Sequence, residues 1–303
     1  MKPAEHGIAD QGSEFYIYTP SRTAQRTFLY PMRAGLFHYL PGYRQERRSF
    51  DSFLIMAVRD GAMDVTVAGA THRAGKGDFA LIDCYAPHAY GTDEGADVLW
   101  LHFDGPTARA YYDLIHDRLG SVFSFRDSGY ATTRLTNIYR TFHEAARVSE
   151  PLMGKYITDV LTEFAIGAES AGTAAAAPRN AGDPASDTAR ESSITRTHAI
   201  EDVLAYIANH LHEPLTVGDL AARAYMSEYH FIRVFKKETG YTPHAYVIDA
   251  RMHAAEYRLI NSDIPLRQLC EECGFTDAST FCAAFRKRTG MSPIEFRRRS
   301  AIR

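Results

Sequence analysis

The chain has 303 residues, which is enough for about two domains of ordinary size. Its hydrophobic content of 45% and charged content of 23% are ordinary for soluble globular proteins. No apolar run approaches the ~20 residues that a membrane-spanning helix needs, and no apolar stretch follows the first charges of the chain. We therefore expect a cytoplasmic protein and neither a secreted nor a membrane protein.

The net charge of −3 conceals a difference between the two ends of the chain. From Thr195 onward there are 15 Lys and Arg residues against 13 Asp and Glu residues. The positive charge is concentrated in the last 18 residues, which contain Arg286, Lys287, Arg288, Arg297, Arg298, Arg299 and Arg303. A basic end of this kind is either a solvated tail or a surface for nucleic acid.

Residues 28–103 read mostly as short strands. A buried-strand pattern covers 53–58, period-two alternation covers 63–67, and further strands are predicted at 79–82 and 98–103. Asp60-Gly61 is predicted to form a turn between the first two of these strands. Short strands at turn spacing favour a small β-barrel or sandwich.

Two amphipathic helices are predicted after the strands. One apolar face contains Leu135, Ile138, Tyr139 and Phe142, and the other contains Ile157, Val160, Leu161 and Phe164. These faces either seal the barrel or pair with a second copy of the chain. Residues 168–195 follow without large apolar runs and are rich in Ala, Gly, Ser and Asp, so we expect a flexible linker there.

From residue 196 onward the pattern is helical, and one unit occurs twice. Thr216 and Asp219 have the form of a capping box, and Ser227 is placed to cap the next helix. A helix from Pro243 to about Ile260 joins the two copies. The copies share their spacing at seven positions: Phe231, Phe235, Lys236, Lys237, Thr239, Gly240 and Pro243 correspond to Phe281, Phe285, Arg286, Lys287, Thr289, Gly290 and Pro293.

Two helix-turn-helix units joined by a helix resemble the DNA-binding domain of the AraC/XylS family of bacterial transcription regulators. The resemblance covers about 100 residues and both copies, through Ala221, Ser227, Tyr246, Arg251, Gly274, Asp277, Phe296 and the repeated positions. Residues 1–167 resemble that family's cupin-like sensor domain more loosely, through Gly75-x-Gly77-Asp78, Pro87-His88-x-Tyr90 and Trp100-x-x-Phe103. The fold expected from the resemblance is α+β: a cupin-like or jelly-roll-like barrel with following helices (1–167), a linker (168–195) and an all-α domain (196–303).

In such units the second helix enters the major groove of double-stranded DNA. The resemblance implies base contacts from one set of residues: Tyr229, Ile232, Arg233, Ala278, Ser279, Thr280 and Ala283. It implies phosphate contacts from a second set: Ser227, His230, Lys236, Lys237, Arg286, Lys287 and Arg288. Ala283 has only a methyl group, so we expect specificity from the first unit and mainly phosphate anchoring from the second.

A small barrel can enclose one small ligand. The candidate effector-binding residues are Arg48, His88, Tyr90 and Trp100, and in sugar-sensing members of the family the positions near the last three contact the sugar. A sugar is therefore one candidate effector. Each of these side chains also has an ordinary structural interpretation as a turn, wall or core residue.

The predicted function is a transcription regulator that binds DNA and responds to a small molecule, as a homodimer whose interface lies in helices 132–167. RNA polymerase is a further partner if the protein is an activator. Two alternatives are a constitutive DNA-binding protein with a purely dimerising barrel, and a metal-dependent cupin enzyme. His72, His88 and His102 occur singly without H-x-H, and Cys270-x-x-Cys273 has no second pair. We therefore expect no metal, no cofactor and no enzymatic activity, with the cysteines as core residues.

Overall fold

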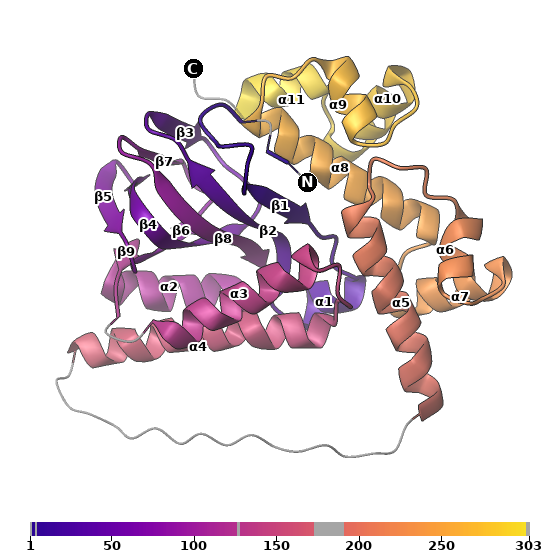
Figure 1. The fold of residues 1–303 in the computed structure, drawn as a ribbon, viewed down its shortest axis with the longest axis horizontal. Helices are drawn as coiled ribbons and strands as arrows, with labels where there is room; N and C mark the ends of the chain where they lie inside the picture. The colour runs from indigo at the N-terminus through magenta and orange to yellow at the C-terminus, as the bar shows by residue number, and fades with distance from the viewer. Residues whose placement is uncertain (1, 4, 126–127, 173–190, 301–303) are drawn as a thin grey trace.

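The computed structural model of the protein describes residues 2–3, 5–125, 128–172 and 191–300. An N-terminal β-barrel with its own helices lies beside a C-terminal helical domain (Figure 1). This arrangement confirms the predicted α+β class. Within the described ranges, no helix combines the length and the apolar character needed to cross a bilayer.

All strand pairs of the barrel are antiparallel, in two sheets that share one long strand. One sheet has the order β1-β2-β8-β4-β6-β9, and in the other β7 lies between β3 and β4, with β5 on the far side of β4. The strands are β1 (Glu14–Ile17), β2 (Tyr30–Tyr39), β3 (Tyr43–Arg47), β4 (Phe53–Val67), β5 (Ala70–Gly75), β6 (Phe79–Asp83), β7 (His88–Thr92), β8 (Ala96–Asp104) and β9 (Val122–Phe123).

The predicted turn at Asp60-Gly61 is wrong. Strand β4 continues through both residues, and its register against β8 shifts between Val58 and Asp60. Gly61 has φ +68°, and a Cβ there would lie 2.1 Å from the Gly95 carbonyl oxygen, so only glycine fits. Such a bulge bends a strand without ending it, which lets β4 pass from one sheet to the other.

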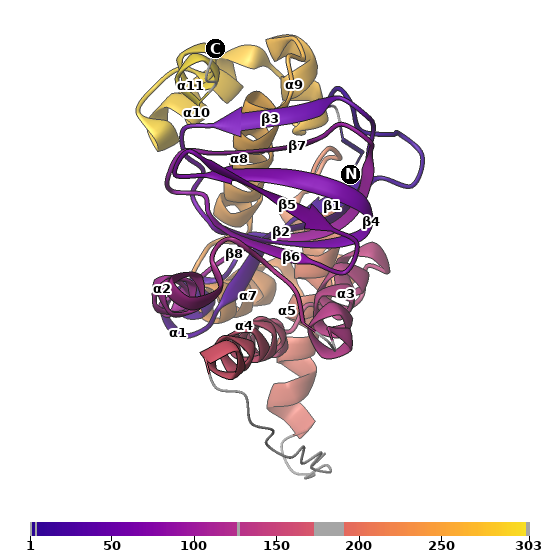
Figure 2. The ribbon, with the colours of Figure 1, turned by 90° about the vertical axis from the view of Figure 1, so that its left-hand side faces the viewer.

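Four helices belong to the barrel domain: α1 (Arg22–Thr27), α2 (Ala108–Leu119), α3 (Gly129–His143) and α4 (Glu150–Gly172). Helices α2, α3 and α4 lie along one side of the barrel (Figures 1 and 2). The predicted apolar faces of α3 and α4 are buried within the chain, Tyr139 being half-buried. These faces therefore seal the barrel, and a dimer through 132–167 requires the opposite faces, where Leu152 and Ile166 are exposed.

The C-terminal domain contains the two predicted helix-turn-helix units. Its helices are α5 (Glu191–Asn209), α6 (Val217–Arg223), α7 (Glu228–Thr239), α8 (Pro243–Asn261), α9 (Leu266–Glu272), α10 (Ala278–Thr289) and α11 (Pro293–Ser300). Of the predicted linker, residues 168–172 end α4 and 191–195 begin α5, while 173–190 lie outside the described residues.

Local signals account for the helix ends. The Thr216 hydroxyl accepts a hydrogen bond from the Asp219 backbone N–H (3.1 Å), as the capping box predicted. Asp277 caps α10 through the Thr280 N–H (2.7 Å). Gly240 and Gly290 end α7 and α10 in the left-handed conformation, with φ +79° and +78°, because glycine takes this conformation without steric cost. Ser227 lies at the predicted cap position of α7, but its side chain makes no capping hydrogen bond. The repeat in the sequence is thus a repeat of the buried phenylalanines and of the glycine helix ends.

Helix α8 connects the two units and also lies against the barrel (Figure 2). The Tyr246 hydroxyl donates to the Thr19 carbonyl oxygen (2.6 Å), and the Thr19 hydroxyl hydrogen-bonds His253 Nδ1 (3.1 Å). Near α1, the Arg22 guanidinium lies 4.9 Å from the Tyr241 ring centroid. The residues just after β1 therefore dock onto the helix that positions both helix-turn-helix units.

Candidate nucleic-acid interface and effector cavity

Helix α7 has one buried face and one exposed face. Phe231 and Phe235 are fully buried against α5, α6 and α8. Tyr229 is 80% exposed and Ile232 is 38% exposed. The predicted base-contacting residues of α7 share the outer face with two of the predicted phosphate-contacting residues, around a shallow hollow of about 560 Å³ that is lined by Tyr229, Ile232, Arg233, Lys236 and Lys237. Of the other two predicted phosphate contacts, Ser227 is exposed at the start of the helix and His230 is half-buried.

Helix α10 presents a smaller and less polar surface. Phe281 and Phe285 are buried, whereas Ala278, Ser279, Thr280 and Ala283 are exposed. Arg286 and Lys287 are exposed one turn further on. The second unit therefore presents the exposed cations Arg286 and Lys287 beside short side chains, which suits contact with the DNA backbone more than base readout.

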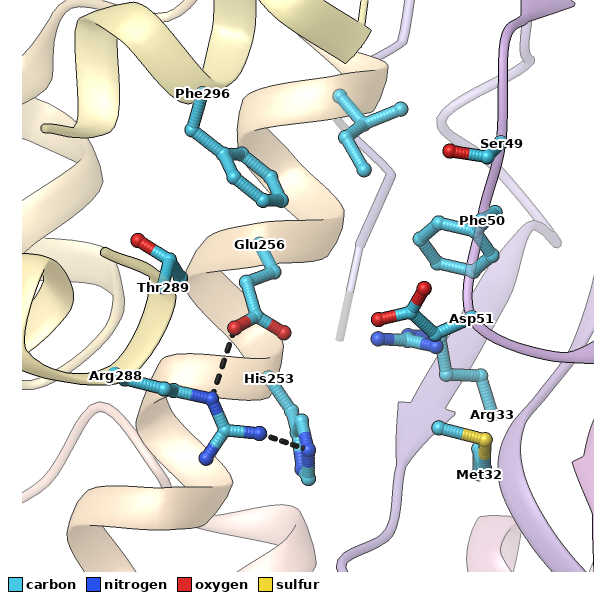
Figure 3. A pocket seen from close by; sticks show the side chains of 11 residues that line it. Met32, Arg33, Ser49, Phe50, Asp51, His253, Glu256, Arg288, Thr289 and Phe296 are labelled. Carbon is cyan, nitrogen blue, oxygen red and sulfur yellow. Dashed lines mark hydrogen bonds and ion pairs between the residues drawn. The ribbon is translucent and has the colours of Figure 1, made fainter. Parts of the chain in front are cut away.

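Arg288 does not lie free on the surface, as the prediction of a phosphate contact required. Its guanidinium bonds to the Asp249 carboxylate on α8. It also bonds to the Glu256 carboxylate and to His253 Nε2 on the same helix (Figure 3). The reason is helical spacing: Arg288 follows Phe285 by three residues and Phe281 by seven, so its side chain is directed toward α8 although the residue remains partly open to solvent. Arg288 thus ties α10 to α8.

The same residues border a cleft of about 410 Å³ between the two domains. Figure 3 shows Arg288, Glu256 and His253 on one side, and Arg33, Phe50 and Asp51 on the other. Arg33 is 3% exposed and lies 4.4 Å from the Phe50 ring centroid, while its Nε and Nη1 have no hydrogen-bond partner. Because both domains line this cleft, it exists only while they are docked.

Three of the four predicted effector residues lie inside the barrel. His88, Tyr90 and Trp100 are all buried. His88 Nδ1 donates to the Ala86 carbonyl oxygen (2.9 Å), but His88 Nε2 and Trp100 Nε1 have no hydrogen-bond partner among the residues that the structure describes. Buried polar atoms without partners are uncommon and point to a ligand or water in the cavity. The barrel interior therefore retains capacity to bind a polar group.

The prediction for Arg48 is wrong, because Arg48 is exposed beyond the end of β3. Its neighbour Arg47 is 1% exposed, with its guanidinium 5.4 Å from the Tyr90 ring centroid. Alternation along β3 explains the difference: Tyr43 and Arg47 are four residues apart and point to the same inner face. Alternation counted from Tyr43 therefore identifies Arg47, from the sequence alone, as the arginine that points into the barrel.

Sequence reasoning also missed Glu5 and Tyr257, which meet in the barrel mouth. The Tyr257 and Tyr43 hydroxyls both donate to the Glu5 carboxylate, at 2.8 and 2.9 Å. Burial raises the pKa of Glu5, and the Arg47 charge and the two phenols oppose that rise. Tyr257 follows Tyr246 by eleven residues, so three helical turns separate them on one face. Extending the apolar face of α8 by one turn reveals Tyr257; no signal in the sequence marks Glu5.

The barrel cavity itself is almost full. It has a volume of about 10 Å³, which is about the space of one water molecule. Its lining comes from the barrel, the N-terminal segment and α8: Glu5, Phe37, Tyr39, Leu54, Met56, Tyr90, Trp100, His102 and Tyr257. No small molecule larger than water fits in this conformation.

We expect the free energy of unfolding to fall between pH 7 and pH 5 because of buried histidines. Burial and the Arg33 and Arg47 charges hold the pKa of His102 well below its usual value, and burial with Arg47 lowers the pKa of His88 to about 4. The unfolded chain takes up these protons near pH 6.5, whereas the folded chain does not. Stability is therefore present above pH 6.5 and is lost below it, by about 2 kcal/mol per histidine at pH 5.

Urea unfolding at pH 7 and pH 5 measures this effect, with His102→Asn as the comparison. The asparagine amide keeps a polar contact for the Ser52 hydroxyl, which lies 2.9 Å from His102 Nδ1, but it does not titrate. Between pH 7 and pH 5, the free energy of unfolding of the variant should fall by about 2 kcal/mol less than that of the wild type. An identical loss in both proteins contradicts the assignment to His102.

Among the described residues, no three His, Cys, Asp or Glu side chains come together in the manner of metal ligands. His72 is exposed on β5, apart from His88 and His102 in the barrel interior. Cys84, Cys270 and Cys273 are buried and Cys282 is half-buried, all as free thiols. Three of the four cysteines thus lie in the core.

Two family models match the chain at the two domains. Residues 30–157 match the AraC-like ligand binding domain, and residues 220–299 match a helix-turn-helix domain. The first match spans β2 through the first turns of α4, and the second runs from within α6 to within α11. One match thus falls in the barrel domain and the other falls in the helical domain.

Similar proteins extend the match over most of the chain. The transcriptional activator NphR of Rhodococcus sp is 26% identical over 84% of this chain and 72% of its own length. The MmsAB operon regulatory protein of Pseudomonas aeruginosa is 24% identical over 89% of this chain and 83% of its own. The probable transcriptional regulator LumQ of Photobacterium leiognathi is 36% identical, but over only 30% of this chain and 37% of its own. The chain belongs to the AraC family of transcriptional regulators, with an AraC-like ligand binding domain followed by a helix-turn-helix DNA-binding domain.

Proposed function

We propose that the protein binds an operator through α7 and α10, and that a small molecule in the barrel controls this binding. The observation that carries the proposal is the outer face of α7, where Tyr229, Ile232 and Arg233 are exposed together beside two lysines. Two recognition helices on one rigid connecting helix are suited to successive major-groove segments, about 34 Å apart. A homodimer would cover two such double sites.

We further propose that the two units read DNA unequally. On α7, the Arg233 guanidinium is long enough and free to bind a guanine in bidentate fashion. On α10, Ala283 takes a comparable outward position and offers only a methyl group for contact with thymine. Specificity then comes mainly from α7, and α10 adds affinity through Arg286 and Lys287.

Replacement of Arg233 by alanine tests this division. We expect a loss of about 1–3 kcal/mol on the preferred operator and a relaxed preference at one base pair. Lys237→Ala is the matched control on the same helix, and it should weaken binding to all sequences about equally and lower the salt dependence by about one ion. Fluorescence anisotropy on operators selected from random DNA measures both.

Equal losses for the two variants on every operator would contradict base readout by Arg233. Losses for Arg286→Ala and Lys287→Ala that depended on operator sequence would contradict the anchoring role of α10. If neither helix affected DNA binding, the proposed interface itself would be wrong.

For the output, we propose activation of transcription through contact with RNA polymerase, since one similar protein is named a transcriptional activator. A constitutive DNA-binding protein with a dimerising barrel is the second candidate, and the cavity of about 10 Å³ favours it. A thermal-shift screen with sugars and small aromatic compounds separates the two, because any compound that binds the native state raises the melting temperature. Operator affinity should change with such a compound under the first proposal only.

A further inference from the structure

An aromatic side chain of the protein itself, that of Tyr257, occupies the cavity of the barrel. This residue lies in the last turns of α8, a helix of the DNA-binding domain, yet it is only 4% exposed. Its ring lies nearly parallel to the Trp100 indole, with 6.4 Å between centroids and 13° between planes. The Phe15 ring lies 4.7 Å away. Tyr257 thus fills the place where a ligand of the barrel would lie.

The surroundings of Tyr257 match the parts of a phenol. Its hydroxyl donates to Glu5 Oε1 (2.8 Å), and aromatic rings line its faces and edge, including Phe50 at 6.4 Å. Phe37, Leu54 and Met56 make part of the cavity wall apolar, and the other lining residues are Tyr39, Tyr90, Trp100 and His102, which are aromatic rings that each carry one or two polar atoms. The Glu5 carboxylate at the end of this aromatic slot would fix the orientation of a single hydroxyl.

We propose that the barrel is a receptor for a small phenol, and that Tyr257 of α8 occupies the same place when the two domains are docked. This inference rests on the proposed function, in which the barrel binds the effector. A sugar fits the slot less well, because any hydroxyls directed at Phe37, Leu54 and Met56 would be buried without partners, whereas a phenol presents only one hydroxyl. Each such unpaired buried group costs about 1–3 kcal/mol.

Competition for one place couples the effector to the DNA-binding domain. A phenol in the slot excludes Tyr257, so it binds only the conformation in which the end of α8 has left the barrel. Asn261, whose side-chain oxygen accepts from buried Arg47, leaves with the same turn of helix. Because the phenol binds one of two arrangements, it shifts the population toward the undocked one. Helix α8 joins both helix-turn-helix units, so their freedom to move changes with occupancy of the slot.

The chain carries its own reporter for this competition. Trp100 is its single tryptophan, and it stacks on Tyr257. Titration of the full-length protein with p-cresol, the isolated side chain of tyrosine, should change Trp100 emission as Tyr257 is displaced. Toluene is the matched probe without the hydroxyl.

Tyr257→Ala removes the internal competitor and opens the slot. We expect this variant to bind p-cresol at least about tenfold more tightly than the wild type, and toluene at least about tenfold more weakly than p-cresol. Tyr257→Phe is the matched control, since its ring still fills the slot, and its p-cresol affinity should stay within a few-fold of the wild type. Tyr257→Leu, which keeps apolar contact in the barrel, replaces the alanine variant if that variant fails to fold, with the same direction of change.

Hydrogen exchange provides the second measurement. In the wild type, saturating p-cresol should accelerate exchange in residues 254–261 of α8 and leave the barrel strands protected. Equal p-cresol affinity in the wild type and Tyr257→Ala, or p-cresol binding without faster exchange in α8, would overturn the competition.

The outcome also separates this proposal from the proposed function. If p-cresol leaves Trp100 emission unchanged while L-arabinose changes both emission and operator affinity, the phenol assignment falls and the effector-responsive function stands. If no compound changes either property, both fall, and the protein is a constitutive DNA binder.

Discussion

The Gly274→Ala variant should lose the second helix-turn-helix unit and with it high-affinity operator binding. Gly274 has φ +76°, and a Cβ at this position would lie 2.2 Å from the Leu211 carbonyl oxygen. The left-handed conformation costs a non-glycine residue about 1–2 kcal/mol. The contact adds to this cost, because the obstructing atom belongs to the backbone and cannot rotate away. We expect a total loss of at least about 3 kcal/mol.

Surrounding contacts prevent an easy adjustment. The Leu211 carbonyl accepts from Arg251 Nε (3.0 Å), and Arg251 also donates to the Glu213 carbonyl (2.7 Å). The same methyl group would lie 2.8 Å from the Arg251 guanidinium. Gly274 therefore lies where three parts of the domain meet: the connection after α5, helix α8 and the turn before α10. A methyl group at this position would push these parts away from one another.

Gly290→Ala is the matched control. Gly290 has nearly the same backbone conformation, φ +78°, but the place that a Cβ would take has no obstructing atom within 4 Å. Its replacement should cost only the conformational term, about 1 kcal/mol. Urea unfolding followed by circular dichroism at 222 nm, with anisotropy on operator DNA, compares the two. Equal losses for both variants would show that the close approach to Leu211 is unimportant.

The second large effect is expected for Arg47→Met, which removes the buried cation of the barrel mouth. Glu5 would then lie in the barrel without the positive charge that opposes the rise of its pKa. A buried carboxylate that loses its counter-charge takes up a proton, which at pH 7 costs about 3–4 kcal/mol. Methionine retains most of the side-chain volume, so little of this loss comes from a cavity.

A double variant isolates the electrostatic part. Glu5→Gln in the Arg47→Met background removes the carboxylate, so most of the lost stability should return. The single variant should also be less impaired at pH 5 than at pH 7, by about 2–3 kcal/mol, because protonation of Glu5 is then inexpensive. Urea unfolding followed by Trp100 fluorescence reports on the barrel directly. A loss that is independent of pH, with no recovery in the double variant, would show that Arg47 acts only through packing.

Sequence by itself determined the features of the protein that depend on local spacing. The positions of the helix-turn-helix units, the Thr216 cap, the glycine ends of α7 and α10 and the outer face of α7 follow from the sequence, since amphipathic period, caps and glycine stops act within a few residues of the chain. His88, Tyr90 and Trp100 are buried in the barrel, and their role in effector binding stays a prediction. Errors arose where one residue changes the outcome, as with Arg47 and Arg48, or with the bulge between Val58 and Asp60.

Tertiary structure alone decided how distant segments meet. Glu5, Arg47 and Tyr257 come from the N-terminal segment, a barrel strand and the DNA-binding domain, and nothing in their spacing links them. Arg288 resembled a free phosphate anchor until α8 supplied Asp249 and Glu256. Pairing across more than 200 residues depends on which surfaces remain unburied after each domain folds, and periodicity carries no such information. The docking of α8 into the barrel is therefore known only from the folded chain.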